Sequence, residues 1–263
     1  DALVEMDAVL VKAGYLRSLA KQGKRLPMRE ELPEGPSEEM RELRANVVVR
    51  GEELRRHIFG PADVFVVSHA WLTLEHPDPF GTRLEELCEE LDGQRAKSCD
   101  LVFVDACSLP QGAAPGIADD AVVDRMDILF ASGASKVIIL SDIHDFSKFD
   151  DTGYTVNERL YRQRGWCCFE FGVARLFGRI EHELPKEMER FRPAAVAELV
   201  AKGKVRFGQR ADEAKVMRVL RRTLIAEHVE EEVLLPIAVG EAEARREAIA
   251  TCLKALRGDV RQR

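Results

Sequence analysis

The chain of 263 residues is 46% hydrophobic and 32% charged, which indicates a globular protein and excludes a disordered one. No apolar run approaches the roughly 20 residues that a membrane helix needs, and the N-terminal segment lacks the basic start of a signal peptide, so we expect a cytoplasmic protein without a membrane span. Residues 61–177 carry 10 basic and 20 acidic side chains within a formal net charge of −7, which argues against a nucleic-acid partner because phosphates require a basic surface.

The first 60 residues show helical patterning that is interrupted by a linker. Apolar residues recur at near-helical spacing over residues 2–22, which predicts an amphipathic helix. A stretch with Pro and Gly follows, and Ser37 before two glutamates is typical of a new helix start. We therefore predict an N-terminal helical arm over residues 1–60. The chain begins with Asp1 rather than Met, which is typical of a processed or trimmed chain.

Residues 61–184 change to the pattern of an α/β domain. Short apolar runs without alternation, typical of strands that are covered on both faces, follow one another with amphipathic helices between them. Strands are predicted at 64–67, 100–108 and 135–142, helices at 82–91, 124–134 and 164–178, and a short fourth strand at 179–184. This alternation indicates a parallel sheet with crossover helices on both faces.

Residues 185–263 have mostly helical patterning. Three stretches, 192–203, 210–227 and 240–258, have helical spacing, and the last ends at a glycine of the kind that closes a helix. We expect this C-terminal helical region to pack on the α/β domain.

Polar and aromatic side chains follow the predicted strands at the point where each strand ends. Open parallel α/β sheets bind their ligands beyond these carboxyl ends. The helix at 164–178 also begins there, and a helix start presents free N–H groups that favour anions. The candidate site residues are Ser68, His69, Trp71, Asp105, Ser108, Arg164, Trp166 and Glu170.

Four sequence strings that contain these residues resemble a known family. VVSHAW, VFVDACSLPQ, RMDILFASGASKVIIL and RGWCCFE look like the successive motifs of the fungal heterokaryon-incompatibility (HET) domain, over residues 62–177. His69 replaces the aromatic residue that is usual in the first motif. The strings are closest to those of uncharacterised algal and protist proteins, and they also resemble the related TIR domain. The positions that match the TIR pattern are Asp105, Leu109, Gly112, Trp166, Cys167 and Glu170.

The resemblance implies a flavodoxin-like fold, a role in signalling or defence, and NAD as a substrate rather than a bound cofactor. Many TIR domains hydrolyse NAD, and their catalytic glutamate matches Glu170. Breaking the nicotinamide–ribose bond creates an oxocarbenium-like centre, which a carboxylate stabilises. The other candidates are then expected to bind substrate: Trp71 or Trp166 by stacking on a ring, and Arg162 or Arg164 by meeting the pyrophosphate.

Simpler interpretations of the same residues stay open. Glu170 is also what a helix dipole favours in a first turn, Asp105 suits an Asx turn, and tryptophans commonly fill cores. The main alternative function is a non-catalytic module that self-associates or docks in a larger protein assembly. A further alternative is an enzyme acting on another nucleotide or nucleoside. Neither a G-x-G-x-x-G motif nor a Walker A loop is present, which disfavours hydride transfer and NTP hydrolysis.

Two other kinds of site have little support in the sequence, a Cys–His nucleophile and a metal site. The six cysteines form no C-x-x-C pair, and without a signal peptide we expect free thiols. We therefore predict no bound metal. The weak candidates are Cys107, Cys167 and Cys168 for a nucleophile, and His69, His76, Asp78 and Asp105 for a metal.

Overall fold

The computed structural model describes part of the chain. These are residues 2–33, 37–51, 53–54, 56, 61–111, 122, 125–141, 152–189, 199, 204–207 and 212–219. The chain divides into two units, Asp1–Val216 and Met217–Arg263, and every element named below belongs to the first. Most of the predicted C-terminal helical region lies outside the described residues, so its packing stays a prediction. In the described part, no helix has the length and apolar character needed to cross a membrane.

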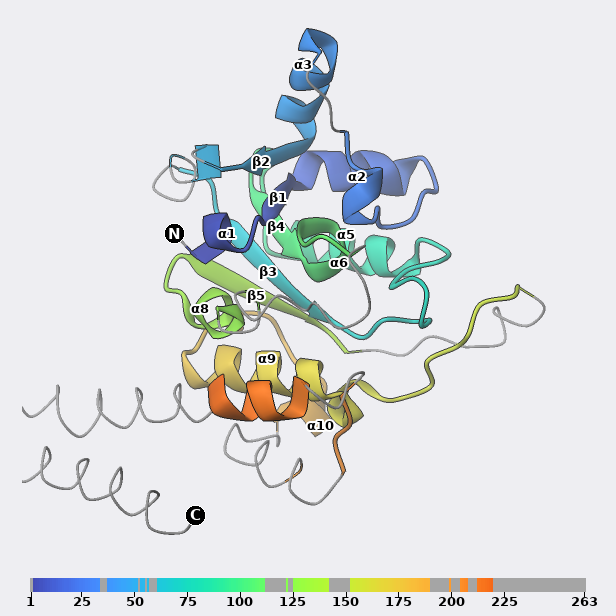
Figure 1. Ribbon diagram of the computed structural model, residues 1–263, viewed down its shortest axis with the longest axis vertical. Coiled ribbons are helices and arrows are strands. Elements are labelled where there is room, and N and C mark those ends of the chain that lie inside the picture. Colours follow the sequence, from blue (N-terminus) through green and yellow to red (C-terminus); the bar gives the residue numbers. More distant parts are fainter. Residues whose placement is uncertain are drawn as a thin grey trace, which may run out of the picture. The chain divides into compact units, whose positions relative to one another are not determined.

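A mixed sheet of five strands forms the centre of the first unit (Figure 1), in the order β2-β1-β4-β3-β5. The strands are β1 (Val9–Lys12), β2 (Val48–Arg50), β3 (Val64–His69), β4 (Leu101–Val104) and β5 (Ser135–Leu140). The central strand β3 pairs in parallel with β4 and β5, whereas β1 runs antiparallel to β4 and β2. The α/β class and the three parallel strands are as predicted.

The predicted helix over residues 2–22 is wrong in its middle, because β1 separates α1 (Ala2–Glu5) from α2 (Ala13–Lys21). Asp7 has a left-handed backbone (φ 49°), which ends the first helix, and the consecutive apolar residues from Val9 are buried completely in the sheet. With β2 from the same region, the predicted helical arm supplies two strands to the sheet.

Helices cover both faces of the sheet (Figure 1). α2 and α5 (Thr82–Gly93) pack on one face, where Leu16, Leu84 and Leu87 share a buried cluster with Phe65 and Val67 of β3. α8 (Met126–Ala131) and α9 (Gly165–Leu176) lie on the other face and contact each other. Because successive residues of a strand point to opposite faces, Val66 and Ser68 point toward α9, whereas His69 points toward α5.

The remaining elements are short. They are α3 (Glu38–Val47), α6 (Asp105–Ser108), α10 (Lys186–Glu189) and the 3-10 helices η1 (Arg29–Glu31) and η3 (Tyr161–Gln163). α6 corrects the predicted strand over 100–108: the strand ends at Val104, and the chain turns at once into a helical turn. The predicted fourth strand at 179–184 reduces to one parallel bridge between Val137 and Ile180.

Candidate active site at the end of β3

Glu170, Ser68 and Tyr161 form a buried chain of hydrogen bonds at the carboxyl end of β3. Ser68 Oγ donates to Glu170 Oε2 at 2.5 Å and lies 2.5 Å from the hydroxyl of Tyr161. When Glu170 is ionised, its carboxylate can only accept, so Ser68 donates to it and Tyr161 in turn donates to Ser68. All three are buried: Ser68 is 0% exposed, Tyr161 2% and Glu170 8%. These hydrogen bonds therefore join β3 to η3 and α9, whose residues Tyr161 and Glu170 lie 93 and 102 positions beyond Ser68 in the sequence.

The environment of Glu170 favours its protonated form. Burial raises the pKa of this carboxyl to about 8, the negative charge of Asp105 adds to the effect, and the hydrogen bond from Ser68 opposes it. At neutral pH the group is mostly a neutral acid that is poised to ionise in mildly alkaline solution. A buried carboxyl group whose pKa is raised this far, beside the end of a parallel strand, is the kind of group that active sites contain.

Tyr161 completes this series of hydrogen bonds, and it was not among the residues predicted for the site. It sits in η3, directly before α9, and burial raises the pKa of its hydroxyl well above the ordinary value, with Cys167 and Glu170 contributing. The only sequence signal was its position three residues before the Arg164-Gly165-Trp166 string. The pairing with Ser68 depends on how α9 packs on β3, which no local pattern reveals.

His69, Asp105 and Trp71 form a second cluster on the other side of the β3 end. Asp105 receives hydrogen bonds at 2.8 Å from His69 Nε2 and at 2.9 Å from the indole N–H of Trp71. A third hydrogen bond comes from the backbone N–H of Ala106 at 2.7 Å. Burial alone would raise the pKa of Asp105, but His69 and these donors outweigh it, so the pKa lies below its usual value. Asp105 is thus an ionised carboxylate, in contrast to Glu170.

One nitrogen of His69 has no partner in the described part of the chain. Nε2 faces Asp105, and the buried Nδ1 makes no hydrogen bond there. Asp105 orients the ring as a carboxylate orients a histidine in many enzymes, because a fixed partner on one nitrogen fixes the role of the other. The Nδ1 atom of His69 could therefore act as a base, and the hydrogen bond between Nε2 and Asp105 also serves as a structural contact.

Arg164 joins the two loops that border these clusters. Its guanidinium donates to the carbonyl of Trp71 at 2.5 Å, of Asn157 at 2.7 Å and of Arg159 at 2.8 Å. The residue is 9% exposed, and burial lowers the pKa of its guanidinium. These three bonds give Arg164 a structural role at the start of α9. Its predicted contact with a pyrophosphate stays a prediction.

The structure places Ser108 and Trp166 apart from these two clusters. Ser108 is fully buried, and its hydroxyl accepts a hydrogen bond from the backbone N–H of Val104 at 3.1 Å, which fastens α6 to β4. Trp166 donates to Asp212 at 3.2 Å and packs edge-on against Phe207. Both side chains therefore have structural partners of their own.

The weaker candidates have structural partners too. The five described cysteines are free thiols, as expected, and burial raises the pKa of Cys107 and Cys167 well above the ordinary value, which disfavours a thiolate nucleophile. The fully buried carboxylate of Asp78 accepts three backbone N–H bonds at 3.0 to 3.1 Å. No group of three or more potential metal ligands occurs among the residues that the structure describes.

Comparisons with protein-family models, with curated proteins and with solved structures find no match to this chain. A function for this chain is therefore inferred from the geometry at the end of β3 and from the motifs that lie there.

Proposed function

We propose that the chain is a TIR/HET-like signalling or defence domain that hydrolyses the nicotinamide–ribose bond of NAD, with Glu170 as its catalytic carboxylate. The observation that carries the proposal is the hydrogen bond from Ser68 to Glu170. Two residues from separate motifs, 102 positions apart, meet at the end of the central parallel strand.

The strand order supports the flavodoxin-like part of the proposal. The parallel strands lie in the order β4-β3-β5, and Ile180 bridges to β5 on its outer side. Counted along the chain, this is the order 2-1-3-4 with which a flavodoxin-like sheet begins. The connections from β3 and β4 leave in opposite directions, so the ligand crevice of such a fold lies beside the end of β3. Glu170 and Ser68 occupy that position.

The proposed reaction adds water across the bond between nicotinamide and ribose and yields nicotinamide, ADP-ribose and a proton. Nicotinamide leaves as a neutral molecule, so the main requirement is negative charge beside the oxocarbenium-like ribose. Ionised Glu170 supplies that charge, and the hydrogen bond from Ser68 favours the ionised form. Because the pKa is raised to about 8, we expect the rate to increase with pH up to that region.

The test is nicotinamide release from NAD by the full chain, measured by chromatography at pH 7 and pH 8.5. We expect Glu170→Gln to lower the rate by at least about 100-fold, in the range reported for lost electrostatic stabilisation. Glu158→Gln, on an exposed loop residue, is the matched control and should leave the rate unchanged. Failure to turn over NAD or NADP in any oligomeric state would contradict the proposal.

A second candidate function is a non-catalytic module that self-associates or joins a larger assembly. The observation that favours it is a set of exposed apolar side chains on the loops that border the same strand ends. Leu74 is 63% exposed, Phe80 44% and Leu160 38%. This function predicts that Leu74→Asp weakens self-association measured by sedimentation, while Glu170→Gln leaves it intact.

A further inference from the structure

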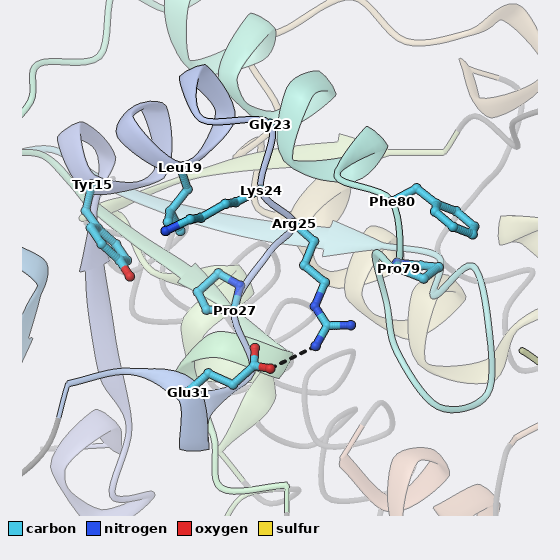
Figure 2. A pocket seen from close by; sticks show the side chains of 9 residues that line it. All are labelled: Tyr15, Leu19, Gly23, Lys24, Arg25, Pro27, Glu31, Pro79 and Phe80. Carbon is cyan, nitrogen blue, oxygen red and sulfur yellow. Dashed lines mark hydrogen bonds and ion pairs between the residues drawn. The ribbon is translucent and has the colours of Figure 1, made fainter. Parts of the chain in front are cut away.

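A groove of about 590 Å³ lies between the end of α2, the segment 23–31 and the turn at Pro79–Phe80, and Figure 2 shows its lining. Neither Glu170 nor Ser68 lines it, so it is separate from the site at the end of β3. Its volume falls within the range of about 300 to 1,000 Å³ that small-molecule sites occupy. The size suits one ligand of moderate mass.

The walls of the groove are flat and apolar at both ends. Tyr15 and Phe80 lie at opposite ends of the lining in Figure 2, with Pro27 between them. Phe80 is 44% exposed, and its ring meets Tyr154 edge-on at 6.1 Å, which fixes its orientation. An exposed aromatic side chain on a rigid turn favours packing against the flat ring of a ligand, because this removes apolar surface from water.

The polar groups of the groove carry excess positive charge. Lys24 lines it, and its ammonium group makes no hydrogen bond or ion pair with another described residue. Arg25 pairs with Glu31 at 2.8 Å, with side chains 36% and 45% exposed, so this pair neutralises itself and stays accessible to a ligand. Among the described residues no carboxylate pairs with Lys24, so its ammonium group beside the aromatic walls is suited to binding an anionic group.

Buried contacts within the protein fix the position of the two walls of the groove. Asp78 Oδ2 accepts the backbone N–H of Leu26 at 3.0 Å and of Leu84 at 3.1 Å, which fastens the segment 23–31 to the start of α5. Gly81 has a φ of 82°, and a Cβ there would lie 2.7 Å from the carbonyl oxygen of Lys24. The two walls therefore meet at a close backbone approach that only glycine allows.

We propose that this groove is a second binding site, for a small organic anion that carries a flat aromatic ring. The ring packs against the exposed ring of Phe80, and the anionic group pairs with Lys24. This inference is independent of the proposed function of Glu170. Phe80 and Arg25 both contact Tyr154. The next residue, Thr155, accepts a backbone hydrogen bond from Leu74 in the loop after β3, so the groove is linked to that loop.

The test uses the fluorescent probe 8-anilinonaphthalene-1-sulfonate with the full chain, and its neutral analogue N-phenyl-1-naphthylamine as the matched ligand without the sulfonate. We expect saturable one-site binding of the anion, at least about tenfold tighter than that of the neutral analogue. Lys24→Glu and Phe80→Ala should each weaken binding by about tenfold. Lys97→Glu makes the same charge change at an exposed position outside the groove and should have no effect. Circular dichroism confirms that each variant is folded.

Three results would overturn the proposal. The first is equal binding of the charged and neutral probes, and the second is unchanged binding by both Lys24→Glu and Phe80→Ala. The third is binding that disappears as protein concentration rises while sedimentation shows a dimer, since this would assign the groove to a second copy of the chain. Each result concerns the probe alone, so none depends on whether NAD is hydrolysed.

Discussion

Replacing Glu170 with glutamine should stabilise the protein at neutral pH, because the folded chain has to keep this carboxyl protonated. Glu170 is 8% exposed, and burial raises its pKa from 4.5 to about 8. The folded protein therefore holds the proton more tightly than the unfolded chain does. Linkage requires that the free energy of unfolding falls as pH rises from 4.5 to about 8, and that it levels off above that pH.

The size of the effect follows from the shift in pKa. One pKa unit corresponds to about 1.4 kcal/mol, so the interval from 4.5 to pH 7 lowers the free energy of unfolding by about 3 kcal/mol. The full interval to the folded-state pKa corresponds to about 5 kcal/mol. Glutamine resembles the protonated acid in shape and accepts the same hydrogen bond from Ser68, but it cannot ionise in either state.

Urea denaturation of the wild type and of Glu170→Gln at pH 5, 7 and 8.5 measures this difference. We expect nearly equal stability at pH 5, an advantage of about 3 kcal/mol for the variant at pH 7, and a larger one at pH 8.5. The pH dependence common to both proteins cancels in the comparison. A variant that is less stable at pH 7, or a difference that does not change with pH, would refute the reasoning. The same trade between stability and an ionisable site is common in enzymes.

Two further variants test the packing at the start of α9. Arg164→Lys should lower the free energy of unfolding by about 2 to 3 kcal/mol, because one ammonium group cannot donate to three separate carbonyls. The control variant Arg162→Lys, on the exposed neighbouring turn, should change the free energy of unfolding little. Equal urea midpoints for the two variants would contradict the structure. Gly165→Ala places a Cβ 2.3 Å from the ring of Phe207, so it should lower the free energy of unfolding by about 1 to 3 kcal/mol and lower the melting temperature with it. The Cβ of the control variant Gly93→Ala enters open space and meets no neighbouring atom. A calorimetric scan that shows the same melting temperature for both alanine variants would argue against this contact.

Apolar patterning made the parallel part of the fold predictable. Nearly all residues of β3, β4 and β5 are buried on both faces of the sheet, so continuous apolar runs identified these strands. The helix at 82–91 was predictable because it presents one apolar stripe to the sheet, whereas α9 is buried along nearly all its length. These patterns are local, because the burial of a strand or helix determines which residue types that same segment contains.

β1 escaped the prediction for a physical reason. Its four residues lie between two short helices, and apolar residues before and after it continue a spacing that suits a helix. Pairing with β4 and β2 supplies backbone hydrogen bonds that outweigh the weak local preference. An antiparallel strand that joins a parallel sheet from a distant segment leaves no periodic signal of its own.

The amino-acid sequence by itself determined which residue types stand at the strand ends and that Glu170 lies in the helix that begins at the RGW string. Only the tertiary structure decided which of them meet. Alternation along β3 sends Ser68 to the α9 face and His69 to the α5 face, so neighbours in sequence belong to different clusters. Tyr161 and Glu170 reach Ser68 because α9 packs against β3, and contacts of such long sequence separation are set by packing of whole elements rather than by local pattern.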